Sequence, residues 1–83
     1  MFKRKDVRVG YIVKLRDGRI MEITEIRDAR IFEYPLWGEH YFKYEDAIIS
    51  IPNGFKYEDI ECILSRKKTH DYREIKEIVE ANL

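Results

Sequence analysis

The sequence has very few of the residues that build disulfides, metal centres and phosphate-binding loops. Cys62 is the only cysteine, so an internal disulfide is excluded and a reducing environment is expected. The two histidines, His40 and His70, are far apart along the chain, and the four glycines do not cluster. We therefore expect no metal, no cofactor and no catalytic centre, and we interpret Cys62 as a small, buried hydrophobic residue.

Long apolar stretches are also missing, which excludes a membrane-spanning segment. Residues 1–6 are rich in basic side chains but no apolar segment follows them, so we expect a cytoplasmic protein, not a secreted one. The net charge is zero, so composition favours neither nucleic acid nor a membrane as the partner. The chain does contain 45% hydrophobic and 39% charged residues, a balance typical of a folded protein.

The chain, with 83 residues, is long enough for one domain, and its charge is unevenly distributed. Residues 1–30 carry nine basic and five acidic side chains, a balance of +4. Residues 31–64 carry two and seven, a balance of −5, and residues 65–83 carry five and four, a balance of +1. These segments either form a dipolar surface or are mixed and neutralised by folding.

The first regular element predicted is a β-strand over residues 7–15, where apolar side chains alternate with polar ones and only Ile12 breaks the pattern. Asp17 and Gly18 follow, a pair that favours a two-residue type I′ hairpin with a positive φ at the glycine. Such a turn would place Leu15 opposite Ile20. A bulge near residues 21–22 would then bring the rest of the second strand, which ends near residue 27, into phase.

The remaining pattern predicts further strands and one helix. We expect strands over residues 30–34, 39–44, 47–51 and 60–65, with breaks at 35–38 and 52–54. Asp71 and Glu74 have the spacing of a capping box, and apolar residues follow at helical spacing. The sequence therefore predicts a short amphipathic helix over residues 71–82.

One pentapeptide, FKYED, occurs twice, at residues 42–46 and 55–59. Each copy precedes an apolar run, so we interpret both as turns that enter a strand. The interval between the copies is too short for a solenoid unit. The repetition therefore indicates two similar local structures, or a duplication without functional meaning.

Two segments resemble parts of a known fold. Residues 9–19 (VGYIVKLRDGR) resemble the opening hairpin of small SH3-like barrels of the KOW kind and of the kind that phages and mobile elements encode, although Tyr11 stands where those proteins usually have aspartate. Residues 57–64 (YEDIECIL) resemble the 3₁₀ turn and closing strand of such proteins. The resemblance implies a non-catalytic binding module and transfers no functional residue. The expected fold is mainly β: one domain, residues 1–83, with a five-stranded antiparallel SH3-like barrel over 6–65 and a C-terminal α-helix over 71–82 packed on it.

A cluster of aromatic residues in the middle of the chain provides the first candidate site. Six large rings fall between Phe32 and Tyr44, and strand alternation sends about half of them outward. Exposed rings in small barrels anchor peptides or stack on bases. Trp37, next to a glycine at an expected hairpin tip, is the strongest candidate. The predicted partner-binding residues are Tyr34, Trp37, Tyr41 and Tyr44.

The basic ends of the predicted barrel provide the second candidate site. Antiparallel pairing of the first and last strands would bring two runs of cations together, and such patches bind phosphate backbones. The alternative is two solvated chain ends without a ligand. The predicted nucleic-acid-binding residues are Lys3, Arg4, Lys5, Arg66, Lys67 and Lys68.

These candidates leave two functions open. The acidic aromatic middle narrowly favours a protein-interaction module, such as a small accessory protein of a phage or mobile element, while the basic ends favour nucleic acid. The same strand pairing places Ile12 beside Ile63 on the outer face, where the C-terminal helix would cover them as a lid. A second copy of the chain could cover them instead, so both a monomer and a homodimer remain open.

Overall fold

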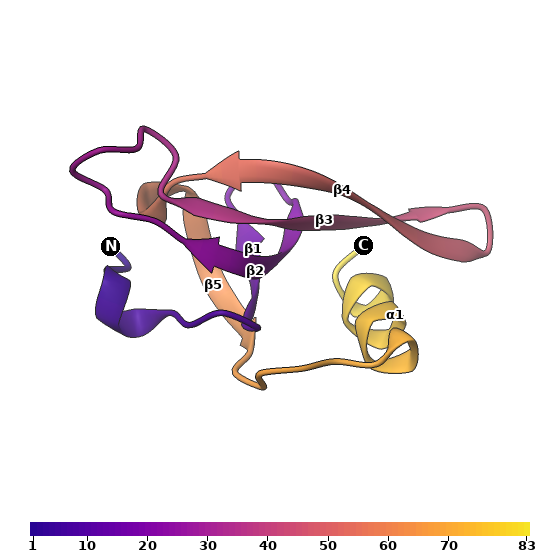
Figure 1. Cartoon of the computed structure of the whole chain (residues 1–83). Coiled ribbons are helices and arrows are strands. Elements are labelled where there is room, and N and C mark those ends of the chain that lie inside the picture. Colours follow the sequence, from indigo (N-terminus) through magenta and orange to yellow (C-terminus); the bar gives the residue numbers. More distant parts are fainter.

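The computed structural model describes residues 1–83 and contains a single sheet with one α-helix beside it (Figure 1). Two short 3₁₀ turns precede the first and last strands. The elements in chain order are η1 (Arg4–Asp6), β1 (Ile12–Leu15), β2 (Ile20–Ile26), β3 (Leu36–Tyr44), β4 (Ala47–Phe55), η2 (Tyr57–Asp59), β5 (Ile60–Ser65) and α1 (Tyr72–Ala81). No helix is long and apolar enough to span a bilayer.

The five strands are antiparallel and lie in the order β4-β3-β2-β1-β5. The predicted pairing of the first strand with the last is confirmed, but the predicted barrel is not closed, because β4 and β5 form the two free edges. The nine-residue strands β3 and β4 are longer than their neighbours and run on as a two-stranded ribbon. Figure 1 shows this ribbon extending over α1, away from β5.

The first hairpin has a three-residue loop, not the predicted two-residue turn. Gly18 N–H donates to the Leu15 carbonyl, Leu15 N–H donates to the Arg19 carbonyl, and Gly18 has a φ of +97°. This is a turn closed by a glycine bulge, so the positive φ is confirmed and the turn type is wrong. The extra loop residue places Ile20 opposite Lys14. Met21 and Ile23 then point into the first core without the predicted bulge at residues 21–22.

Between β2 and η2, one expected strand and two expected breaks are wrong. Residues 30–34 form a loop, not a strand. The N–H groups of Ile31 and Phe32 donate to the Asp28 carbonyl within this loop, so they do not pair with a neighbouring strand. Residues 36–38 belong to β3, and residues 52–54 belong to β4. Pro52 is tolerated there because β4 is an edge strand. At the other end of β4, Ile48 N–H donates to the Tyr72 hydroxyl oxygen at 3.0 Å.

Apolar side chains from the two faces of the sheet form two separate cores. The first core lies on the face opposite α1, and the second lies between the sheet and α1. The members of the first core are Val7, Val13, Leu15, Met21, Ile23, Leu36, Phe55 and Ile60. The members of the second core are Ile12, Ile20, Ile48, Ile75 and Val79.

The predicted lid is confirmed for Ile12 and wrong for Ile63. Ile12 is fully buried in the second core, against Ile75 and Val79 of α1. Ile63 pairs with Val13 and packs against the first core, because β5 contains two register irregularities. Leu64, which strand alternation would place in the barrel interior, packs against the second core instead.

Helix α1 begins as predicted. Asp71 Oδ1 accepts the Glu74 N–H at 2.8 Å, and Glu74 Oε1 accepts the Asp71 N–H at 3.3 Å, which completes the capping box. The two FKYED copies both enter a strand, but they differ in conformation. Residues 42–46 form the hairpin between β3 and β4, with Glu45 at a φ of +54°, whereas residues 57–59 form η2. The 3₁₀ turn implied by the SH3-like resemblance is therefore present at η2.

Candidate functional site

The most promising surface is a depression between the N-terminal segment and the end of β5. Its volume is about 600 Å³, within the range of small-ligand clefts. Phe2, Tyr11 and Ile63 give it an apolar floor, and all three also pack against the first core. Its charged lining residues are Lys5, Asp6, Arg8 and Arg66. The depression therefore combines aromatic surface with an excess of positive charge.

A second depression of about 690 Å³ adjoins the first, and the two share Lys5 and Arg8. Arg4 adds a further cation to it, and no acidic side chain lines it. We call the four arginine and lysine side chains around these depressions the basic surface: Arg4, Lys5, Arg8 and Arg66. An anion at the boundary between the depressions would face cations from η1, from the turn before β1 and from the end of β5.

Local structure directs these cations outward. Asp6 Oδ2 accepts the Lys3 N–H at 2.8 Å, and Asp6 N–H donates to the Lys3 carbonyl, so the one acidic residue of the depression caps η1. Val7, directly after η1, is buried in the first core and anchors the turn to the sheet. The side chains of Arg4 and Lys5 are left in solvent.

None of the cations of the basic surface forms an ion pair. The ion pairs of the molecule involve other residues, from Asp17–Arg19 in the first hairpin to Lys43–Glu80 between β3 and α1. The charge of Arg4 nevertheless acts on one acid, Asp28. A hydrogen bond from Arg30, with a smaller contribution from the charge of Arg4, holds the pKa of Asp28 below its usual value. The positive charge of the basic surface is therefore uncompensated by direct contacts.

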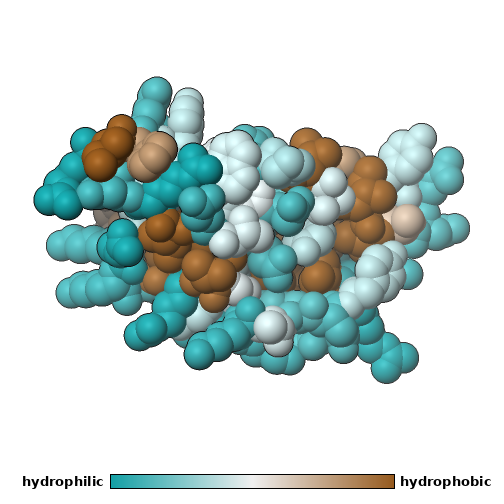
Figure 2. Space-filling model, in the orientation of Figure 1, coloured by the Kyte–Doolittle hydropathy of each residue, from teal (hydrophilic) through white to brown (hydrophobic).

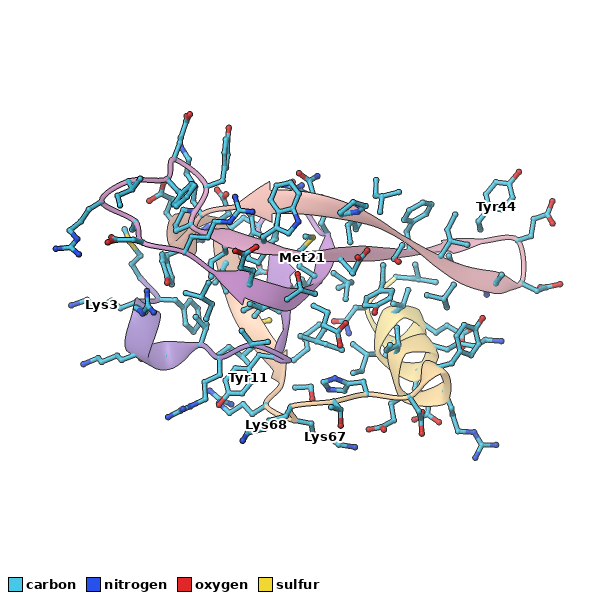
Figure 3. All side chains as sticks on the ribbon, in the orientation of Figure 1. Lys3, Tyr11, Met21, Tyr44, Lys67 and Lys68 are labelled. Atoms are coloured by element: carbon cyan, nitrogen blue, oxygen red, sulfur yellow. The ribbon has the colours of Figure 1, made fainter.

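The structure brings together only part of the predicted cation cluster. Lys5 and Arg66 line one depression, as the strand pairing predicted. Lys67 forms an ion pair with Glu74 that holds the pKa of this carboxyl below its usual value, and Lys68 lines a different depression. Figure 3 shows Lys3 at one end of the molecule, away from Lys67 and Lys68.

Arg8 and Tyr11 are members of the site that sequence reasoning missed. Alternation places both of them simply within a long first strand, whereas β1 begins at Ile12. The four residues 8–11 form a turn in which Tyr11 N–H donates to the Arg8 carbonyl at 3.2 Å. Gly10, a residue type that favours turns, was the only local signal for this turn.

The predicted aromatic site is divided between distant places. Tyr34 is 48% exposed, and both it and Trp37 approach Gly54, where an added Cβ would lie 2.9 Å from the indole. Trp37 is half-buried in β3 with the Arg27 guanidinium 5.3 Å from its ring, so it is not the exposed hairpin tip that was expected. Tyr41 packs against the second core, and Tyr44 lies at the far end of the ribbon.

A different apolar surface emerges on the ribbon. Lys43 and Ile48 face α1, so their alternating neighbours point away from the helix. We call this surface, formed by Phe42, Tyr44, Ile49 and Ile51, the ribbon face. Tyr44 is 61% exposed, Ile49 41% and Ile51 48%, and Figure 2 shows apolar surface along this end of the molecule. The run of consecutive isoleucines, apolar on both faces of a strand, was the signal for it.

Beside the ribbon face lies His40, whose ring centroid is 5.3 Å from that of Phe42. Burial, together with the nearby charge of Arg19, lowers the pKa of His40 below its usual value. The imidazole is therefore neutral at physiological pH and adds to the apolar character of this surface.

Ser65, His70 and Glu22, which lie far apart in sequence, meet beneath the segment between β5 and α1. Ser65 Oγ is 2.6 Å from His70 Nε2, and His70 Nδ1 is 3.6 Å from Glu22 Oε2. The order of groups resembles a hydrolytic triad, but the second distance exceeds that of a hydrogen bond. Glu22 and His70 line the fourth depression, but Ser65, which would have to be the nucleophile, lines none of the four. The cluster connects residues 66–70 to β2.

The structure contains no group of three or more histidine, cysteine, aspartate or glutamate side chains that could hold a metal ion. Cys62 is half-buried on β5, opposite Lys14. Comparisons of the chain with family models, with curated proteins and with solved structures found no match in any of the three. The site is therefore interpreted from its own chemistry.

Proposed function

We propose that this protein is a non-catalytic binding module for nucleic acid, and that the basic surface is its binding site. The observation that carries the proposal is that Arg4, Lys5, Arg8 and Arg66 surround two adjoining depressions without any ion-pair partner. Cations of this kind release the counterions of a phosphate backbone when they contact it, which is the main source of affinity for nucleic acids.

The acidic hairpin between β3 and β4 does not oppose this proposal. Its carboxylates, Glu45 and Asp46, lie at the free end of the ribbon, and Figure 1 shows that end on the opposite side of the molecule from η1. Charges separated by more than about 10 Å are largely screened at physiological salt. Repulsion between these carboxylates and a phosphate at the basic surface is therefore weak.

The fold is consistent with a small binding module. The antiparallel pairing of β1 with β5 supports this, because the resemblance to SH3-like proteins implies the same pairing. We propose that the chain is an opened relative of such barrels, in which the long β3–β4 ribbon leaves the sheet instead of closing it. We further propose that it acts in the cytoplasm.

Fluorescence anisotropy with a labelled oligonucleotide tests the proposed function. The variant carries Arg8→Gln and Arg66→Gln, and the control carries Arg73→Gln and Lys76→Gln on α1, which removes the same charge away from the site. We expect the variant to bind more weakly, with a salt dependence smaller by about 0.7 for each phosphate that it no longer neutralises, and the control to bind as the wild type does. Equal weakening in both proteins, or no binding at low salt, would contradict the proposal.

Protein interaction is the second candidate function, and the ribbon face is the observation that favours it. Three exposed apolar residues on one sheet face form a surface of the kind that protein partners cover. The acidic residues Glu45 and Asp46 at its end would select a partner whose apolar patch is bordered by cations.

Affinity capture from a nuclease-treated lysate tests this second candidate. A protein captured by the wild type should no longer be captured when Ile49→Ser and Ile51→Ser are introduced, and should be retained by Arg8→Gln with Arg66→Gln. A capture pattern that depends on nuclease treatment, or that the isoleucine substitutions leave unchanged, would contradict docking on the ribbon face.

A further inference from the structure

We infer that the first depression takes an unpaired base of a single-stranded nucleic acid, stacked on the ring of Tyr11, while Lys5, Arg8 and Arg66 contact the flanking phosphates. This inference rests on the proposed function and specifies which form of nucleic acid is bound. The apolar floor of the depression, the fixed position of Tyr11 and its coupling to two of the cations all favour such a ligand, and other ligands fit less well.

The floor of the depression is unusual for a pure phosphate site. Phe2, Tyr11 and Ile63 present apolar surface between the cations, and their inner sides pack against the first core. A phosphate alone would gain nothing from this surface, whereas every base has an apolar face that stacks on an aromatic ring. The second depression has an apolar wall of Val7, Val9 and Ile26 but no aromatic ring. Stacking is therefore assigned to the first depression.

Tyr11 is held at a defined position. Its carbonyl accepts the N–H of Ile23 at 2.9 Å, which ties it to the start of β2–β1 pairing, and its N–H donates to the Arg8 carbonyl. Figure 3 shows the Tyr11 side chain between Lys3 on one side and Lys67 and Lys68 on the other. Because the side chain also packs against the first core, the ring loses little conformational entropy when a base stacks on it.

The turn of residues 8–11 couples the ring to the cations. Gly10 has a φ of +101°, and a Cβ there would overlap the Lys68 carbonyl oxygen, so this turn lies directly on the segment that follows β5. The contact brings Arg8 and Tyr11 next to Arg66. Together with the β1–β5 pairing, this contact brings a stacking ring and two phosphate ligands together from distant parts of the chain.

Competing ligands fit the depression less well. In a duplex, both faces of every base are covered by neighbours, so a duplex offers the depression only phosphates. An acidic peptide offers carboxylates to the cations but leaves the apolar floor without a planar partner. A single strand supplies both charge and an available ring at each nucleotide.

The test compares a labelled oligodeoxythymidine with a strand of the same length in which every base is replaced by an abasic site, both at about 0.05 M salt. The two strands carry the same charge and differ only in their bases. Wild-type protein should bind the thymidine strand at least about fivefold more tightly than the abasic strand. A duplex of equal length, which offers no unstacked base, should bind more weakly than the thymidine strand.

Two substitutions at Tyr11 locate the effect. Tyr11→Phe keeps the ring and should retain the preference for thymidine, whereas Tyr11→Leu keeps an apolar side chain against the first core and should abolish the preference. Thermal melting of both variants establishes that they are folded. The abasic comparison in the wild type remains decisive even if Tyr11→Leu is unstable.

The outcomes separate the inference from the proposed function. Equal binding of the thymidine and abasic strands, or an unchanged preference in folded Tyr11→Leu, overturns base stacking while nucleic-acid binding stands. No binding of either strand or of the duplex overturns the proposed function. Binding of polyglutamate as tight as that of the abasic strand reassigns the basic surface to an acidic protein partner and overturns both.

Discussion

The hydroxyl group of Tyr41 donates a 2.9 Å hydrogen bond to Glu22 Oε1, across the adjacent strands β3 and β2. The pair lies at the edge of the second core, where Tyr41 packs beneath α1. Burial and the negatively charged Glu22 both favour the protonated phenol, so they raise the pKa of Tyr41 well above its usual value. A surface tyrosine can lose its proton in alkali without affecting the fold. Ionisation of Tyr41 would instead place a second negative charge beside Glu22 at the edge of the second core.

Tyr41 makes the fold sensitive to alkali. Above about pH 10 the unfolded chain loses the phenolic proton while the folded protein retains it, so unfolding becomes easier as the pH rises. We expect the melting temperature to fall more steeply between about pH 9 and about pH 11 in the wild type than in Tyr41→Phe. Burial also raises the pKa of Tyr57, and this contribution is common to both proteins. Parallel curves for the two proteins would contradict the assignment.

Gly18 provides a test of backbone strain without steric clash. A Cβ at this position would have no atom within 4 Å, so only the φ of +97° opposes a side chain. We expect Gly18→Val to lower the free energy of unfolding by about 1 kcal/mol or more. Gly18→Asn should lower it less, because asparagine tolerates this region of backbone conformation. Denaturant midpoints measure both effects, and equal stability of Gly18→Val and the wild type is the contrary result.

Helix α1 should stabilise the sheet as a lid. Ile75 belongs to the second core, and its truncation in Ile75→Ala should lower the free energy of unfolding by about 2 kcal/mol or more. Glu77→Ala on the exposed face is the control and should be nearly neutral. Light scattering of the wild type should give the mass of a monomer. A dimer that dissociates in Ile75→Ala at unchanged stability would show that the helix covers a second copy instead.

Neighbouring isoleucines on β4 should respond differently to the same substitution. Ile48 belongs to the second core, whereas Ile49 points to the opposite side and is 41% exposed. We expect Ile48→Thr to cost about 1 kcal/mol or more, and Ile49→Thr to stay within about 0.5 kcal/mol of the wild type. Similar destabilisation of the two variants would indicate that the ribbon face is covered within this chain.

Elements determined by a single local interaction could be predicted from the sequence. The capping box of Asp71 and Glu74 starts α1, and Gly18 has the positive φ expected after aspartate. The hairpin loop length could not be predicted, because Asp-Gly suits both a two-residue turn and a three-residue loop with a bulge. The two kinds of loop differ in whether Ile20 or Met21 enters the first core. Because both residues are apolar, the sequence does not distinguish between them.

Features that depend on long-range contacts escaped prediction. Pro52 by itself indicates the end of a strand, whereas in the fold it is tolerated within β4 because no strand pairs with the outer side of β4. Arg8 and Tyr11 join Arg66 through the β1–β5 pairing, which sets Ile12 opposite Ser65, and through the contact of Gly10 with Lys68, which no local pattern indicates. The two basic runs were correctly paired in part, but Lys67 has an acidic partner on α1 that its own segment does not contain.

The edge strand β4 has a consequence for solubility. An exposed strand edge beside apolar side chains is an efficient template for intermolecular β-sheet, and the ribbon carries both. Pro52 offers no N–H to an approaching strand, and the N–H of Ile48 is already bonded to the Tyr72 hydroxyl. Another chain would therefore find only a fragment of a hydrogen-bonding ladder. Strand-by-strand aggregation is therefore hindered at this edge, although the isoleucines of the ribbon face are exposed.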